Sequence, residues 1–417
     1  MRASDTALPT TGRGIVVVGG SLAGLHAAEA LREHGYDGPV TLLGAEDEPP
    51  YDRPPLSKQV LTGEWQPGRA ALRNGGELAA ARIEVRVGVR ATGLDPDRRE
   101  VRTADGAAVA YDGLIIATGC AARTLPGADP RPGLHTLRTL ADCMALRAEL
   151  RAGARLVVIG AGFIGMEAAA AARSLGAEVT VVDPLPTPMQ AVLGPRIGAA
   201  LGRLHREHGV LFRLGRNVRA VIGSLRVEGV QLDDGTVLPG DAVLVGIGAT
   251  PAVGWLADSG LDITAGLRCD EYLTAGPPEI TAAGDVVSWT NPLFGERMRI
   301  EHWSNAIEQG AAAARNLLAA PAERTPFASV PYFWSDQYDV RIQFAGRAGA
   351  DCLTLLEDPD APVFLILSGR AGRLSGVLSV NAARAFTRAR RMIAQQRPLQ
   401  QAANELSRLL PVEPSRL

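Results

Sequence analysis

The sequence predicts an α/β fold with two doubly wound, parallel-sheet domains, the second inserted in the first, followed by a smaller α+β domain. Three observations predict this fold. A short β-branched run leads into a glycine-rich turn and an alanine-rich helix twice in the chain. A buried strand that ends in a turn follows each copy. From about residue 326 this alternation gives way to an aromatic cluster and a run of short strands.

The first copy begins with the strand 15–18, continues through the turn 19–24 and enters a helix. Strand, glycine turn and helix in this order open a dinucleotide-binding βαβ unit, in which the helix N-terminus receives a pyrophosphate. Ser21 stands where the pattern G-x-G-x-x-G has its middle glycine. The next strand, 40–43, ends near Glu46, which lies 22 residues after the last glycine. We expect this acidic side chain to bind a ribose hydroxyl.

The second copy is complete, because the strand 156–159 leads into all three glycines of the pattern in the turn 160–165. The strand 179–182 then ends at Asp183, 18 residues after the last of these glycines. A carboxylate at this place binds a ribose 2′-hydroxyl and repels a 2′-phosphate, and no arginine follows it before Arg196. The sequence therefore predicts two dinucleotides, and NADH in preference to NADPH at the second site.

Two similar segments define the domain organisation. Residues 111–119 form a buried strand with a glycine turn, and residues 241–248 repeat this pattern after the second copy. A further strand ends at Asp285, which we expect to return to the first nucleotide. The predicted division is 1–124 with 250–325 for the first nucleotide domain, 125–249 for the second, and 326–417 for the α+β domain.

The third domain is predicted from its change of pattern. Aromatic residues concentrate in 331–338, and we expect strands at 340–344, 352–355 and 363–367 and a helix over 381–396. On that helix Arg384, Arg388 and Arg391 recur at helical spacing. Such a stripe is typical of a solvated face, and the alternative is a docking surface for an acidic protein.

Lys58 is the only lysine, because the other 42 of the 43 cationic residues are arginine. Lysine carries a compact point charge on a flexible stem, which arginine does not replace beside a reacting atom. Pro54 and Pro55 stiffen the approach to Lys58, since each fixes its φ angle. We therefore expect Lys58 to supply an active-site charge, although drift in an arginine-rich composition would also leave one lysine.

Composition excludes several classes of protein. A net charge of −2 over 417 residues argues against a protein that binds nucleic acid, and no apolar run is long enough to span a membrane. We expect a cytoplasmic protein. The cysteines have no C-x-x-C or metal-like spacing, which argues against a metal site and against a disulfide between neighbouring cysteines. We expect all of them to be small buried hydrophobic residues. They are Cys120, Cys143, Cys269 and Cys352.

Four motifs carry a likeness to a known family across nearly the whole chain. They are 54–58 (PPLSK), 162–167 (GFIGME), 301–306 (EHWSNA) and 333–338 (FWSDQY), in this order. With them the chain resembles the NADH-dependent ferredoxin reductases that supply electrons to cytochromes P450 and Rieske oxygenases. The resemblance implies FAD in the first domain, NADH in the second, and a third domain that covers the flavin.

The resemblance also implies the roles of individual residues. Lys58 and Glu167 would be the catalytic residues and form an ion pair near the flavin N5, and Trp334 would lie over the flavin. The residues implied to contact FAD are Gly19, Ala23, Gly24, Glu46, Arg53, Lys58, Ala91, Arg138, Asp285, Trp303 and Trp334. Those implied to contact NADH are Gly160, Gly162, Ile164, Gly165, Asp183 and Gly248. For the remaining tryptophans, Trp255 and Trp289, we expect core positions.

The predicted function is the transfer of hydride from NADH to FAD and of single electrons to a transiently bound, acidic [2Fe–2S] ferredoxin. One alternative is a disulfide or peroxide reductase of the same architecture, which the absence of cysteine between residue 24 and Lys58 disfavours. A second is a flavoprotein like apoptosis-inducing factor, whose main role is interaction. We expect neither a nucleic acid nor a membrane as a partner, and favour a monomer.

Overall fold

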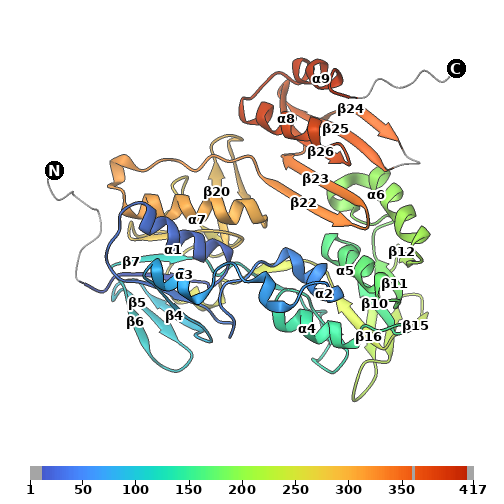
Figure 1. Ribbon diagram of the computed structural model, residues 1–417, viewed down its shortest axis with the longest axis horizontal. Coiled ribbons are helices and arrows are strands. Elements are labelled where there is room, and N and C mark those ends of the chain that lie inside the picture. The colour runs from blue at the N-terminus through green and yellow to red at the C-terminus, as the bar shows by residue number, and fades with distance from the viewer. Residues whose placement is uncertain (1–11, 359–361, 411–417) are drawn as a thin grey trace. The chain divides into compact units, whose positions relative to one another are not determined.

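The computed structural model describes residues 12–358 and 362–410, which divide into two compact units (Figure 1). Of the described residues, the first unit contains those up to Asp52, Ala71–Ala121 and Thr250–Tyr332. The second contains Arg53–Ala70, Ala122–Ala249 and the described residues from Phe333. Among the described residues, no helix combines the length and the apolar character that crossing a membrane requires.

A parallel sheet of five strands in the order β19-β7-β1-β2-β3 forms the centre of the first unit. Every residue of β1, β2, β7 and β19 is buried, which explains why these strands are continuous apolar runs and do not alternate. Their bounds are β1 Ile15–Val18, β2 Val40–Leu43, β3 Ile83–Arg86, β7 Gly113–Ile116 and β19 Ile280–Ala282.

Helices α1 (Leu22–Glu33) and α7 (Trp303–Leu318) pack side by side in the first unit (Figure 1). Gly310 permits this close approach, because a Cβ atom there would lie 2.6 Å from the carbonyl oxygen of Ala23. The buried side of α7 also carries two amides, Asn305 and Gln309, and the Gln309 side chain accepts a hydrogen bond from the Gly284 N–H at 2.9 Å. Helix α7 is thereby joined to the turn after β19.

The rest of the first unit consists of short elements around the sheet. Trp289 is fully buried in the core, as predicted, and donates to the Phe327 carbonyl at 3.2 Å, while Trp255 packs partly buried against the same core. The elements are α3 Gly75–Ala80, β4 Ala91–Asp95, β5 Glu100–Thr103, β6 Ala108–Ala110, η3 Gly254–Leu256, β18 Leu267–Arg268, β20 Val287–Asn291, β21 Glu296–Arg299 and η4 Pro321–Glu323. At the ends of the inserted segment, β8 (Cys120–Ala122) pairs with β17 (Ala249–Pro251).

The second unit contains another parallel sheet, in the order β12-β11-β10-β16-β9. The strands are β9 Leu134–His135, β10 Arg155–Ile159, β11 Glu178–Asp183, β12 Leu211–Leu214 and β16 Ala242–Val245. The helices are α4 Leu140–Glu149, α5 Phe163–Ser174 and α6 Gln190–Glu207. An antiparallel sheet of β13 Val218–Ile222, β14 Gly229–Leu232 and β15 Val237–Pro239 follows β12.

The C-terminal part of the second unit is an antiparallel sheet of five strands in the order β22-β23-β26-β25-β24. The sequence analysis found three of these strands and missed β22 and β26; it also missed the helix α9. The bounds are β22 Tyr332–Gln337, β23 Val340–Gly346, β24 Asp351–Asp358, β25 Val363–Arg370, β26 Arg373–Val380, α8 Ala383–Ala394 and α9 Leu399–Ser407. The aromatic cluster therefore forms the first strand of this sheet.

The segment that contains Lys58 belongs to the second unit. Pro54 and Pro55 begin the 3-10 helix η1 (Pro54–Ser57), where a fixed φ angle and a missing N–H fit the first helical turn. Lys58 ends η1 and precedes α2 (Gln59–Thr62), and η2 (Pro67–Ala70) completes the segment. Lys58 is thus fixed at the junction between η1 and α2, which we call the η1 corner.

Candidate functional site

The first glycine turn follows β1 and has the geometry of a dinucleotide cradle. Gly19 has a φ of +127°, and a Cβ on Gly24 would lie 2.0 Å from the Gly19 carbonyl oxygen, so both positions require glycine. Ser21 has a φ of −134°, which is ordinary extended backbone, so the departure from the glycine pattern causes no strain. Because α1 has no acidic residue in its first turn, its N-terminal amides suit a pyrophosphate.

Two acidic residues lie at the same edge of this sheet. Since β1, β2 and β19 are parallel, their carboxyl ends point the same way, and Glu46 and Asp285 follow two of them. The Tyr51 hydroxyl donates a hydrogen bond to Glu46, which orients that carboxylate. Ala91 begins β4 in the separate sheet of β4, β5 and β6. The glycine turn and both acids therefore gather where such sheets bind dinucleotides, while their contacts to FAD remain a prediction.

Trp303 begins α7 and is a surface residue with 37% of its area exposed. Its indole Nε1–H donates to Asp52 Oδ1 at 2.7 Å, which ties the helix N-terminus to the end of the segment that holds Tyr51. Burial lowers the pKa of the preceding His302 to about 4, so this imidazole is neutral at pH 7. The exposed, fixed indole is consistent with the predicted contact to a ligand.

The second glycine turn lies after β10 and repeats the same construction. Gly160 has a φ of +102°, and a Cβ on Gly165 would lie 2.2 Å from the Gly160 carbonyl oxygen. Gly162 differs, because apart from the adjoining backbone no described atom lies within 4 Å of a Cβ placed there, so it faces open space. Ile164, in the first turn of α5, is 46% exposed, and Gly248, after β16, has a φ of +100°. The open side of this turn fits a dinucleotide.

Asp183 lies at the end of β11, beside this turn. Its Oδ2 accepts a hydrogen bond from the Ala161 N–H at 2.7 Å, and its Oδ1 accepts one from the Leu185 N–H at 2.8 Å. The carboxylate is thereby fixed in place, and each oxygen keeps a lone pair that a ribose hydroxyl can use. Arg216 donates its backbone N–H to the Asp183 carbonyl, but its guanidinium pairs with Asp234 at 3.1 Å.

Lys58 and Glu167, which the sequence analysis paired, form an ion pair within the second unit, between a partly buried lysine and a buried glutamate. Lys58 Nζ lies 2.7 Å from Glu167 Oε2, and the side chains are 17% and 4% exposed. Glu167 lies in α5, directly beyond the second glycine turn, so the pair joins this helix to the η1 corner. The role of the pair beside a flavin remains a prediction.

Two hydroxyls complete the surroundings of Glu167, and the sequence analysis did not predict either. The Ser57 hydroxyl donates to Glu167 Oε2, and the Ser335 hydroxyl donates to Oε1 at 2.6 Å. Both serines are buried. The only signal in the sequence was their place in the motifs at 54–58 and 333–338. With three donors on two oxygens, the buried carboxylate is well compensated.

Two other residues implied to contact FAD also meet in this unit. Arg53 Nη1 donates to the Arg138 carbonyl at 2.6 Å, which fastens the Lys58 segment to the residue before the N-cap of α4. Arg138 itself donates its N–H to Asp142 at 2.9 Å. Trp334 lies half-buried in β22. The contacts of all three to a flavin remain predictions.

The prediction that all cysteines are buried is correct for three and wrong for Cys352. Cys352 is exposed because it lies on β24, the edge strand of the C-terminal sheet. Cys143 lies under the Lys58 segment, with its Sγ 3.1 Å from the Leu56 carbonyl oxygen, and burial raises the pKa of this thiol to about 11. The three buried thiols are packing residues. Among the described residues, no cluster of three metal-binding side chains occurs.

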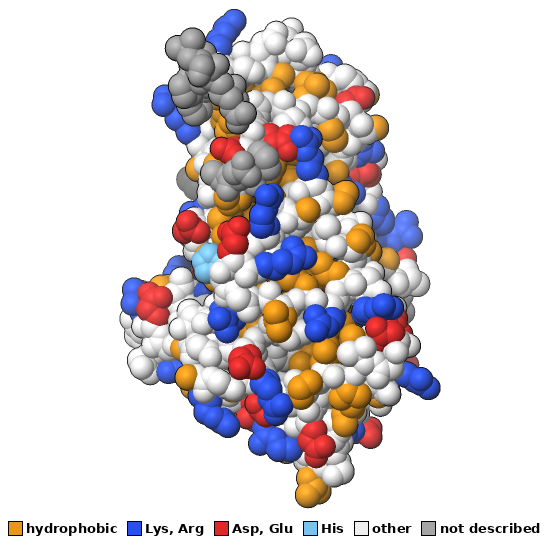
Figure 2. All heavy atoms as spheres, turned by 90° about the vertical axis from the view of Figure 1, so that its right-hand side faces the viewer, with side chains coloured by type: hydrophobic (Ala, Val, Ile, Leu, Met, Phe, Trp, Pro, Cys, Tyr) orange, Lys and Arg blue, Asp and Glu red, His pale blue; other side chains and the backbone are white. Residues whose placement is uncertain are grey.

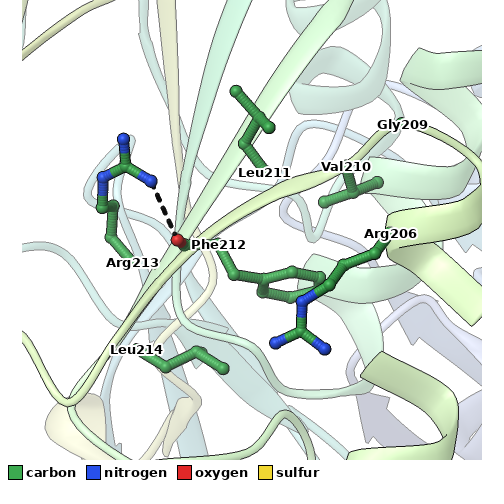
Figure 3. A pocket seen from close by; sticks show the side chains of 7 residues that line it. All are labelled: Arg206, Gly209, Val210, Leu211, Phe212, Arg213 and Leu214. Carbon is green, nitrogen blue, oxygen red and sulfur yellow. Dashed lines mark hydrogen bonds between the residues drawn. The ribbon is translucent and has the colours of Figure 1, made fainter. Parts of the chain in front are cut away.

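A shallow cavity of about 380 Å³ lies along the edge strand β12 (Figure 3). Its lining has no part in the nucleotide turns. Arg213 donates to the Phe212 carbonyl at 3.1 Å, and the Arg206 guanidinium lies 5.0 Å from the centre of the Phe212 ring. Arg213 is a charged residue of the edge strand β12, and charged residues on an edge disfavour pairing with a further strand. Among the described side chains on this side, Figure 2 shows Lys and Arg scattered among hydrophobic and acidic residues and not gathered in one continuous patch.

Comparisons with known proteins agree with this geometry. The family model described as pyridine nucleotide-disulphide oxidoreductase matches residues 13–310. The chain belongs to this family. A second model, described as the C-terminal domain of reductases, matches residues 332–406. The fold class predicted from the sequence, with two nucleotide-binding parts and a C-terminal domain, is thereby confirmed.

Several relatives in the pyridine nucleotide-disulphide oxidoreductase family are similar over most of their length. The chain is 41% identical to the ferredoxin–NAD(+) reductase component of the anthranilate 1,2-dioxygenase system of Burkholderia cepacia, over 91% of this chain and 93% of that protein. It is 39% identical to rhodocoxin reductase of Rhodococcus erythropolis, over 94% and 92%. In the crystal structure of the covalent putidaredoxin reductase–putidaredoxin complex, the matching chain has a TM-score of 0.89 and 33% identity, covering 94% of this chain and 95% of that chain.

These similarities confirm the resemblance to ferredoxin reductases of oxygenase systems that the four motifs indicated. The family and the names of the relatives imply a flavin and NAD as cofactors. Both glycine turns fit such dinucleotides, because each has the close backbone contacts that only glycine permits.

Proposed function

We propose that this protein is an FAD-dependent NADH:ferredoxin reductase that supplies single electrons to a [2Fe–2S] ferredoxin of a cytochrome P450 or Rieske oxygenase system. The observation that carries the proposal is the ion pair of Lys58 with the buried Glu167, which joins the helix of the second glycine turn to η1. Relatives whose names state this activity align over more than nine-tenths of the chain.

FAD is the flavin we propose, because the first glycine turn is shaped for a dinucleotide. The close contact between Gly24 and Gly19 and the open N-terminus of α1 suit a pyrophosphate, which FMN lacks. Glu46 would bind the ribose of the adenosine half. Asp285 and the Trp303 end of α7 would hold the flavin half. When bound, the flavin accepts a hydride and passes its electrons on one at a time.

NADH is the electron donor we propose for the second turn. Asp183 is fixed by two backbone N–H groups and presents a negative charge where a 2′-phosphate would lie. Arg216, the arginine that binds the Asp183 carbonyl, directs its guanidinium to Asp234 and does not offset this charge. Repulsion between the carboxylate and a phosphate therefore favours NADH.

Lys58 would act through its positive charge. Negative charge that develops on a flavin during reduction is stabilised by a fixed ammonium in a site from which water is excluded. Glu167 holds the Lys58 Nζ at 2.7 Å and thereby fixes where this charge lies.

We also propose the division into domains at residues 124, 249 and 325, the remaining contacts to FAD and NADH, and the cytoplasm as the location.

Reduction of cytochrome c tests the proposed function. The purified flavoprotein and NADH are expected to reduce cytochrome c slowly, and an added [2Fe–2S] ferredoxin is expected to accelerate the reaction in proportion to its concentration. Candidate ferredoxins come from oxygenase systems like those of the relatives. If none of several such ferredoxins accelerates the reaction, the function as a ferredoxin reductase is refuted, and a flavoprotein with an interaction role becomes the better account.

A further inference from the structure

A chain of buried side chains extends from the ion pair to the helix α6, entirely within the second unit. Ser335 Oγ binds Glu167 Oε1, and Gln337 Nε2 donates to Ser335 Oγ at 3.0 Å. The Gln337 Oε1 atom lies 2.8 Å from His205 Nε2. Ser335, Gln337 and His205 are at most 1% exposed. These three side chains are called the Glu167 support below.

The direction of every hydrogen bond in the Glu167 support follows from the carboxylate. A carboxylate only accepts, so Ser335 must donate to Glu167, and its oxygen then accepts from the Gln337 amide N–H. The amide oxygen consequently faces His205, which must donate from Nε2. Burial lowers the pKa of His205 to about 4, so the ring is neutral at pH 7 and carries its single proton on Nε2. Each donor points toward Glu167.

The Glu167 support is also anchored to the second glycine turn. Gln337 Nε2 lies 3.5 Å from Met189 Sδ, and the Met189 N–H donates to the Ala161 carbonyl at 2.8 Å. Ala161 is the residue whose N–H binds Asp183. Strand β22 and helix α6 therefore meet at the Gln337 amide, and Met189 connects this amide to the nucleotide turn.

We propose that Gln337, Ser335 and His205 are positioning residues that hold the Glu167 carboxylate, and through it the Lys58 charge, in the orientation that hydride transfer requires. The inference rests on the proposed role of the Lys58–Glu167 pair. Lys58 and Ser57 both bind Oε2 of Glu167, and among the described residues Ser335 alone binds Oε1. Without the hydrogen bond from Ser335 the carboxylate can rotate, and the Lys58 ammonium moves with it.

The test is a set of single and double variants, each purified with its flavin and reduced by NADH in an anaerobic stopped-flow instrument. Gln337→Leu keeps the volume of the side chain and removes both of its polar ends. We expect the limiting rate of flavin reduction to fall about tenfold, and the dissociation constant of NADH to change less than about threefold. Ser335→Ala removes the next donor and gives the same comparison if Gln337→Leu does not fold.

A double-mutant cycle separates positioning from a merely structural role. If Gln337 acts through Glu167, then adding Gln337→Leu to Glu167→Gln changes the rate less than about twofold. The control is Asn316→Leu, since Asn316 is an equally buried amide of the first unit that donates to the Tyr272 and Thr325 carbonyls. It is expected to lower the melting temperature and leave the limiting rate unchanged.

The outcomes distinguish this inference from the proposed function. A wild-type limiting rate in Glu167→Gln would refute the role of the ion pair and the inference with it. A slowed Glu167→Gln combined with a wild-type rate in Gln337→Leu and Ser335→Ala would overturn the inference alone. The same fold loss from Gln337→Leu in both backgrounds would also overturn it.

Discussion

Replacing Lys58 with methionine removes the ammonium and keeps most of the stem. Glu167 is then left 4% exposed without its ionic partner, although the Ser57 and Ser335 hydroxyls still donate to it. Removal of one partner from a buried ion pair destabilises a protein by about 3–5 kcal/mol, and the two remaining donors place this site at the lower end, about 3 kcal/mol. The double variant Lys58→Met with Glu167→Gln leaves no buried charge at this site, so we expect it to lose less stability than Lys58→Met alone.

Thermal unfolding of the flavin-loaded protein checks this order of stabilities. Arg388→Met is the matched control, because Arg388 is an exposed cation that also pairs with a glutamate, Glu405. We expect a change of less than about 1 kcal/mol for that surface pair. The limiting rate of flavin reduction by NADH should fall about a hundredfold in Lys58→Met, as is typical when a fixed stabilising charge is removed. A wild-type rate with full flavin content would refute the role of Lys58.

Three other predictions follow from the described geometry. Gly162→Ala places a methyl group in open space, so we expect an unchanged melting temperature. The KM for NADH should rise at least about tenfold, because the methyl group prevents the pyrophosphate from approaching the backbone closely. An unchanged KM would contradict the assignment of this turn. His205 is neutral in the folded protein, with a pKa of about 4, whereas an unfolded histidine titrates near 6.5, so stability is complete above pH 6.5 and is lost as the pH falls toward 4. From pH 7 to pH 5 the free energy of unfolding falls by about 2 kcal/mol on account of His205. His205→Asn should therefore show a smaller decrease in melting temperature over this pH range than the wild type. An identical decrease in both proteins would contradict a neutral, buried His205. The value of kcat/KM should be at least about a hundredfold higher for NADH than for NADPH, and a preference for NADPH would show that Asp183 does not select the dinucleotide.

The nucleotide-binding sheets could be predicted from the sequence because their signals are local. Buried parallel strands are continuous apolar runs, and the glycine turns have a fixed spacing to the next strand. The acid at Asp183 follows from the same spacing. The Lys58–Glu167 pair was predicted in another way, from an isolated lysine and a family motif, since 109 residues separate the two partners.

The serines that bind Glu167, and the Gln337 amide that binds Ser335, could not be predicted, because such hydroxyl and amide contacts depend on the tertiary structure. Ser335 and Gln337 lie in β22, which the sequence analysis described only as an aromatic cluster. Alternation was the missed signal, since Ser335 and Gln337 are both buried, while Trp334 before them and Asp336 between them are only half-buried. Strand β26 was missed for a related reason, because its buried residues include Ser375, Gly376 and Ser379, which have no strong strand propensity.

Direct reduction of a ferredoxin tests the central claim most simply. The flavoprotein, in catalytic amount, is mixed without oxygen with a known amount of NADH and an excess of oxidised [2Fe–2S] ferredoxin, and the visible absorbance of the cluster is followed. Because a hydride carries two electrons and this cluster accepts one, the account predicts two ferredoxins reduced for each NADH consumed. Consumption of NADH while the ferredoxin stays oxidised would contradict it.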